Sequence, residues 1–164
     1  SGTIKSNLRW GDENATEEEM ITACKHAQAD DFIQSFPDKY DSRIEQGGTN
    51  VSGGQKQRTA IARMLTQKTP IMVFDDSLSA VDAETDAKIR QALRKNLGDS
   101  TVILISHRIT TLMQAECILV LDKGRVAEMG SHEELMQNHG IYRHIYDMQM
   151  TMPEALSEEV NQNE

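Results

Sequence analysis

The chain has 164 residues, of which 38% are hydrophobic and 26% charged, and its formal net charge is −9 at pH 7. This composition is typical of a soluble globular protein with one domain, with or without a small attached subdomain. Its longest apolar runs are strand-sized and far short of the roughly 20 residues that a membrane span requires. The acidic balance argues against a general nucleic-acid surface, so nucleic acid is not an expected partner.

The first third of the chain is predicted to be helical. Thr16 and Glu19 fit a capping box. From Met20 onward, apolar residues recur at i, i+3, i+4 and i+7, which predicts an amphipathic helix to about Asp30. A less regular segment, interrupted by Pro37, follows this helix.

The next stretch, NVSGGQKQRTAIAR at residues 50–63, begins with a small polar turn. Its two glycines let the backbone approach a ligand closely, and the first N–H groups of a helix form an anion site. The turn is therefore predicted to bind a phosphate, although the sequence contains no G-x-x-x-x-G-K-[ST] phosphate loop. A helix is expected from here to about Lys68, with these residues on its apolar side: Ala60, Ile61, Met64 and Leu65.

The pattern changes after Pro70. Ile71–Phe74 and Val102–Ile105 are continuous apolar runs, which predict parallel strands buried on both faces. Between them a helix is expected, with Asp82 as its cap and these residues on one side: Ile89, Leu93 and Leu97. A short helix then leads to a strand at Ile118–Leu121, which Lys123-Gly124 turns into a further strand.

The order of elements predicts an α/β fold with part of a mostly parallel sheet. We expect a helical subdomain at residues 1–68, a sheet flanked by helices at 69–150 and a flexible acidic tail at 151–164. The stretch SHEE at 131–134 fits another capping box, which opens the C-terminal helices. Cys24 and Cys117 have apolar neighbours and no metal-binding spacing, so both are interpreted as inert reduced thiols.

Polar side chains follow the two predicted parallel strands. Asp75 and Asp76 come after the first strand and His107 after the second, and ligands bind at such strand ends in parallel sheets. One aspartate can hold Mg²⁺ through its water shell, and a second can orient or deprotonate a water. Taken alone, paired aspartates more often cap a helix, and a lone Ser-His pair is more often structural. Their combination with the glycine turn favours a phosphoryl-transfer site.

Three segments resemble the motifs of ATP-binding-cassette (ABC) transporter nucleotide-binding domains. VSGGQKQR resembles the signature motif, IMVFDDSLSAVD resembles the Walker B strand running into the D-loop, and ILISHR resembles the switch-histidine loop. The resemblance covers about residues 1–149, and the flanking SGTIKSNL and ECILVLDKGRVAEMGSHEELM are similar to exporter-type cassettes. Recombination and repair ATPases share the signature turn but not these flanks.

The resemblance implies a partial P-loop NTPase fold with a RecA-like ATPase core. In the family, the Walker A phosphate loop precedes the segment where this sequence begins, so the chain resembles the C-terminal two-thirds of a nucleotide-binding domain. Family cassettes pair head to tail around ATP. Ser52, Gly53 and Gly54 would therefore contact the γ-phosphate of ATP held by a partner, and Gln55 would support their turn.

The resemblance also implies roles for the strand-end residues. Asp75 would hold the Mg²⁺ water shell, the segment from Ser79 to Asp82 would form the D-loop between the two sites, and His107 would be the switch histidine. Glu45-Gln46 would lie near the loop that senses the transmembrane domains.

Position 76 departs from the family, which usually has a glutamate there to activate water. The carboxylate of Asp76 is shorter by one methylene, about 1.5 Å, and an error of 1 Å can cost roughly a hundredfold in rate. This resembles the degenerate half of heterodimeric bacterial multidrug exporters, although an ordinary homodimer could also tolerate Asp76. The signature itself is almost intact, with only Val51 in place of the usual leucine.

The resemblance predicts an ATPase domain of an ABC-type exporter that uses ATP and Mg²⁺. Its expected partners are a second nucleotide-binding domain, with a heterodimer favoured, and the exporter's transmembrane domains at the cytoplasmic face of a bacterial plasma membrane. The chain alone is expected to be soluble and inactive. Two alternatives stay open: a regulatory half with little hydrolysis at its own site, and a non-transport cassette such as a repair or translation factor.

Overall fold

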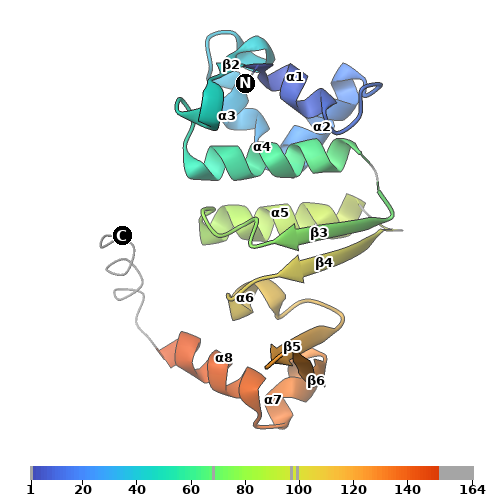
Figure 1. Cartoon of the computed structure of the whole chain (residues 1–164), viewed down its shortest axis with the longest axis vertical. Helices are drawn as coiled ribbons and strands as arrows, with labels where there is room; N and C mark the ends of the chain where they lie inside the picture. Colours follow the sequence, from blue (N-terminus) through green and yellow to red (C-terminus); the bar gives the residue numbers. More distant parts are fainter. Residues whose placement is uncertain (1, 68, 97, 99, 152–164) are drawn as a thin grey trace. The chain divides into compact units, whose positions relative to one another are not determined.

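The computed structural model describes residues 2–67, 69–96, 98 and 100–151, and its contacts divide the chain into two compact units after Ile105. The expectations for Lys68, Leu97 and the acidic tail beyond Thr151 lie outside the described residues. The first unit contains β1 (Gly2–Thr3), α1 (Ile4–Arg9), α2 (Glu17–His26), α3 (Asp30–Gln34), η1 (Lys39–Asp41), β2 (Arg43–Ile44), η2 (Gln46–Gly48), α4 (Gly53–Thr66), β3 (Ile71–Asp75), α5 (Ala83–Asn96) and β4 (Thr101–Ile105) (Figure 1). The second contains α6 (Ile109–Leu112), β5 (Ile118–Asp122), β6 (Arg125–Gly130), α7 (His132–Gln137) and α8 (Ile141–Thr151).

Helix α2 begins as predicted but ends earlier. Its capping box is present, because the Thr16 hydroxyl accepts a bond from the Glu19 N–H and the Thr16 N–H donates to the Glu19 carboxylate. The helix stops at His26 and not near Asp30, because Gln28 adopts a left-handed φ of 53° that no helix can continue through. The residues expected to be irregular then form the short helix α3.

Helix α4 packs against α1 and α2 (Figure 1) and ends at Thr66. Its buried face is rotated from the expected one: Ile61 and Leu65 are buried, whereas Ala60 is exposed. The buried set also includes two threonines. Burial of the hydroxyls is tolerated because Thr59 donates to the Gln55 carbonyl at 2.8 Å and Thr66 donates to the Arg63 carbonyl at 2.7 Å.

Strands β3 and β4 are parallel, with Ile71 opposite Thr101 and Asp75 opposite Ile105. The prediction that both faces are buried is wrong for this chain. Met72 and Phe74 are 1% and 2% exposed and join the core with α5, whereas Ile71 and Val73 are 60% and 52% exposed. The continuous apolar run therefore has one buried face, because the described elements of the first unit cover one of its two sides. The described residues form three sheets, each of two strands, and β3 with β4 is the part of the predicted mostly parallel sheet that is present.

The second unit is a hairpin packed on short helices. Lys123 and Gly124 have φ values of 48° and 74°, which confirms the predicted turn between β5 and β6. The SHEE capping box is also confirmed, at the start of α7. The Glu128 carboxylate accepts bonds from the first backbone N–H groups of α8, at Ile141 and Tyr142.

The two cysteines differ in environment. Cys24 is completely buried in the first core, and burial raises the pKa of its thiol to about 12. Cys117 is exposed, and both cysteines are free thiols. In the part of the chain that the structure describes, none of the helices is both long and apolar enough to cross a lipid bilayer.

Candidate functional site

The glycine turn forms the start of α4. Ser52 is the N-cap: its hydroxyl accepts a bond from the Gln55 N–H at 3.2 Å, and its own N–H donates to the Gln55 side-chain oxygen at 2.9 Å. Through this reciprocal pair Gln55 supports the turn from inside the helix. Ser52 and Gly53 are exposed. The first N–H groups of the helix, which have no intrahelical acceptor, therefore lie at the surface in an arrangement that suits a phosphate.

Gly54 has a second role, which sequence reasoning missed. A Cβ at Gly54 would lie 2.9 Å from the carbonyl oxygen of Ala80, whereas a Cβ at Gly53 would lie 3.6 Å from the Ala80 Cβ, an ordinary contact. Of these two positions, glycine is therefore required at 54, where the loop at Ser79–Asp82 lies too close to the helix for a Cβ. The two segments that were singled out separately in the sequence lie side by side in the first unit.

Gln57 joins these two segments. Its side-chain N–H donates to the Ser79 hydroxyl at 3.0 Å, and its side-chain oxygen accepts from the Ala80 N–H at 3.0 Å. Sequence reasoning did not single out Gln57. The signal was its spacing, because positions 53, 54 and 57 are i, i+1 and i+4, and both glycines therefore lie on the side of the helix that Gln57 faces.

The paired aspartates lie at the carboxyl end of the parallel strands. Asp75 is the last residue of β3 and is exposed. Asp76 is also exposed and has a φ of 47°, a left-handed conformation that aspartate adopts more easily than most residues. Its N–H donates to the Ile105 carbonyl at 3.0 Å, which anchors the turn to β4. Both residues are thus exposed at the carboxyl end of the strand pair.

These carboxylates suit a cation that keeps its bound waters better than a cation coordinated by protein ligands alone. No cluster of three or more histidine, cysteine, aspartate or glutamate residues suited to a metal was found among the described residues. Mg²⁺ needs only one or two carboxylates, since it keeps several waters and takes further oxygens from phosphates. Asp75 can supply such a ligand.

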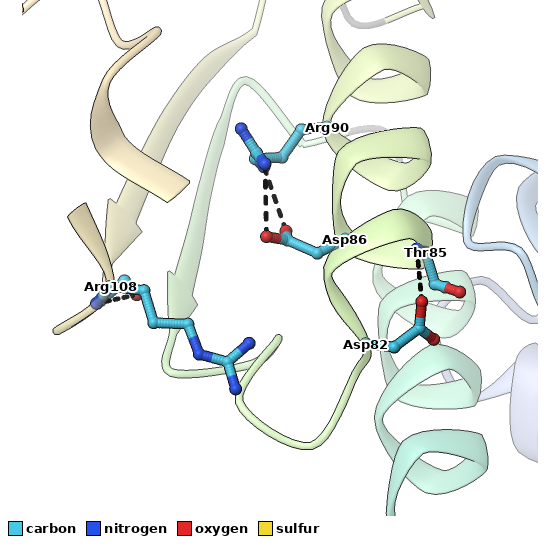
Figure 2. A network of polar contacts seen from close by, with 6 residues as sticks. Asp82, Thr85, Asp86, Arg90 and Arg108 are labelled. Carbon is cyan, nitrogen blue, oxygen red and sulfur yellow. Dashed lines mark hydrogen bonds and ion pairs between the residues drawn. The ribbon is translucent and has the colours of Figure 1, made fainter. Parts of the chain in front are cut away.

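Asp82 closes the loop by capping α5, as predicted. Its carboxylate accepts a bond from the Thr85 N–H at 2.9 Å (Figure 2), and this bond lowers the pKa of Asp82. One turn further, the buried Asp86 pairs with Arg90 at 3.1 Å. The end of the loop is therefore fixed to a helix whose start is well ordered by side-chain bonds.

His107 belongs to the second unit, unlike the other predicted site residues. Its side chain is exposed, and its backbone carbonyl accepts a bond from the Gln149 side chain at 2.7 Å. The same Gln149 accepts a bond from the Ile109 N–H at 2.9 Å, and the Arg108 N–H donates to the Ser106 hydroxyl at 3.0 Å (Figure 2). Helix α8 thus holds the backbone from the carbonyl of His107 to the N–H of Ile109, a support that sequence reasoning missed.

Glu45, which the resemblance would place near the loop that senses the transmembrane domains, is bonded within its own loop. Its carboxylate accepts from the Thr49 hydroxyl at 2.7 Å, and its N–H donates to the Asn50 side chain at 3.1 Å. Asn50 in turn donates to the Arg43 carbonyl at 2.8 Å. The loop before the glycine turn is therefore closed on itself.

The chain is similar to known proteins of one family. The family model described as ABC transporter matches residues 2–79. The chain is 44% identical over 149 residues to an uncharacterized ABC transporter ATP-binding protein, YknU, of Bacillus subtilis, covering 91% of this chain and 26% of that protein. It is 42% identical over 147 residues to the ATP-dependent lipid A-core flippase of Legionella pneumophila strain Paris, covering 90% and 25%.

A solved structure, that of a bacterial Atm1-family ABC exporter with ATP bound, aligns with a TM-score of 0.89 and 39% identity, covering 92% of this chain and 27% of that one. Over about nine-tenths of its length the chain resembles the cassettes of ABC transporters, and its fold is that of an ABC cassette. The chain spans about a quarter of the length of the curated relatives it matches.

Proposed function

We propose that this chain is the C-terminal part of the nucleotide-binding domain of an ABC exporter, which binds ATP with Mg²⁺ and hydrolyses it to drive export. The observation that carries the proposal is the capped, exposed Ser52–Gly54 turn joined to the loop at Ser79–Asp82. This turn occurs in a chain whose fold aligns with an ATP-bound exporter. The exporter's partners would be a second nucleotide-binding domain and transmembrane domains, at the cytoplasmic face of a bacterial plasma membrane.

The turn at α4 would act on the partner's nucleotide. The Ser52 hydroxyl, which already accepts a bond from Gln55, can still donate its proton to a γ-phosphate oxygen. The N–H groups of Gly53 and Gly54 would add two further donors, and the positive end of the helix would favour the negative charge. Residues Ser79 to Asp82 would form the D-loop, which carries contacts between the two sites.

The strand end would act on this subunit's own nucleotide. Asp75 would hold the water shell of Mg²⁺, which supplies charge neutralisation at the phosphates when bound. Asp76 would orient the attacking water, and His107 would contact the transferring phosphoryl group. Because aspartate is shorter than the usual glutamate, we propose that this site hydrolyses poorly and that the chain pairs with a different, more active partner.

A charge reversal at the turn tests the proposal. Ser52→Glu in the complete exporter would place a carboxylate against the partner's γ-phosphate, which costs binding because like charges repel strongly where water is excluded. We expect loss of nucleotide trapping at the partner's site, with ATP binding to this subunit in the open state preserved. The assay is nucleotide trapping in a complex whose two subunits can be distinguished.

Ser131→Glu is the matched control, because Ser131 caps α7 with the same kind of capping box. This control should keep trapping intact at both sites. Loss of trapping at this subunit alone in Ser52→Glu would show that the turn acts within its own subunit, and the paired arrangement would be wrong.

A further inference from the structure

We propose that Gln57 is a positioning residue that holds the D-loop (Ser79–Asp82) against the signature turn (Ser52–Gln55) of the same subunit. The inference rests on the proposed function, since that function gives both segments their roles at the paired nucleotide sites. Its consequence is that the turn facing one nucleotide and the loop between the two sites move together.

The contact is specific because one side-chain amide makes two bonds to adjacent residues. Gln57 donates to the Ser79 hydroxyl and accepts from the Ala80 N–H, both at 3.0 Å. Hydrogen bonds weaken steeply outside a narrow range of distance and angle. A planar amide that makes both bonds therefore allows little sliding of the loop along the helix. The missing Cβ of Gly54 lets the Ala80 carbonyl lie close to the same helical turn.

Arg58, the residue after Gln57, anchors the same part of α4 to the region of α2 and α3. The Arg58 guanidinium donates to the Gln28 carbonyl at 2.7 Å and lies over the Phe32 ring at 4.8 Å. Successive residues of one helical turn thus bind the D-loop and the connection between α2 and α3. The start of α4 is held from both sides, so a displacement of the signature turn would be transmitted to the D-loop through Gln57.

Hydrogen exchange of the Ala80 amide tests the contact directly, in the complete protein without nucleotide. Gln57→Met keeps a side chain of similar length but removes both bonds. We expect the Ala80 amide to exchange roughly two- to tenfold faster in this variant, as for the loss of one hydrogen bond. Gln57→Glu retains an acceptor for the Ala80 N–H and should preserve most of the protection.

Gln67→Met is the matched control, because Gln67 lies at the exposed C-terminal end of the same helix. This control should leave the exchange of the Ala80 amide unchanged. Unchanged exchange of the Ala80 amide in Gln57→Met would overturn the inference, whatever the protein's activity.

Steady-state ATP hydrolysis by the complete exporter tests the consequence. Because Gln57 positions a loop and touches no nucleotide in this proposal, Gln57→Met should lower kcat severalfold and leave the KM for ATP unchanged. A raised KM with an unchanged kcat would indicate a binding role and overturn the positioning role. Absence of ATP turnover in the unaltered exporter would instead refute the proposed function, while the exchange experiment would still decide the contact.

Discussion

The two glycines of the signature turn should respond in opposite ways to the same substitution. Both Gly53 and Gly54 lie in the first turn of α4 with helical backbone, so alanine is compatible with the conformation of each. Their surroundings differ. A Cβ at position 53 would meet the Ala80 Cβ at 3.6 Å, whereas a Cβ at position 54 would meet the Ala80 carbonyl oxygen at 2.9 Å.

The magnitudes follow from two opposing terms. Alanine is favoured over glycine in a helix by up to about 1 kcal/mol, and this gain applies to both positions. At position 54 the contact with a backbone atom is too short, and relieving such overpacking costs about 1–3 kcal/mol. Gly53→Ala should therefore be neutral or stabilising, whereas Gly54→Ala should lower the free energy of unfolding by about 0–2 kcal/mol.

Thermal unfolding of the complete nucleotide-binding domain measures this difference, with each variant serving as the other's control. A gap of about 2 kcal/mol between the variants corresponds to roughly 4–8 °C in Tm for a domain of this size. Gly54→Ala should also speed hydrogen exchange at the Ala80 amide, because the displaced loop loses its bond to Gln57. Equal Tm values for the two variants, with unchanged exchange at Ala80, would refute the close packing of the D-loop on α4.

Two further predictions concern the strand end and the buried thiol. Asp76→Glu should raise ATP turnover at this subunit's own site, because the carboxylate moves about 1.5 Å toward the water and a shift of 1 Å can change the rate roughly a hundredfold. Unchanged single-site turnover with intact nucleotide binding would show that this distance does not limit that site. Burial raises the pKa of Cys24 from 9.0 to about 12, so the folded state keeps a proton that the unfolded state loses between these values. The contribution of the protonated Cys24 thiol to stability is complete below about pH 9 and is lost as the pH rises toward about 12. Denaturant unfolding should therefore show a free energy of unfolding that falls between about pH 8 and about pH 10.5, and that falls less in Cys24→Ala. An equal decrease in both proteins would argue against the thiol as its origin.

Local patterns in the sequence were enough to predict the ends of several elements. The capping boxes at Thr16 and Ser131, the cap at Asp82 and the turn at Lys123-Gly124 all appear in the structure. Each depends on residues within three positions of one another, so the spacing alone brings donor and acceptor together. The resemblance of three motifs to ABC cassettes was likewise readable from short segments, and the comparisons with known proteins confirm it.

Features that depend on distant parts of the chain were decided only by the tertiary structure. The apolar run at β3 could not reveal that one of its faces is exposed in this chain, because hydrophobicity does not say what covers each side. The bond between Gln57 and Ser79 joins residues 22 positions apart. No periodicity encodes such a contact. Packing of the loop on α4 brings the two side chains within hydrogen-bonding distance, and the absence of a Cβ at Gly54 permits that packing.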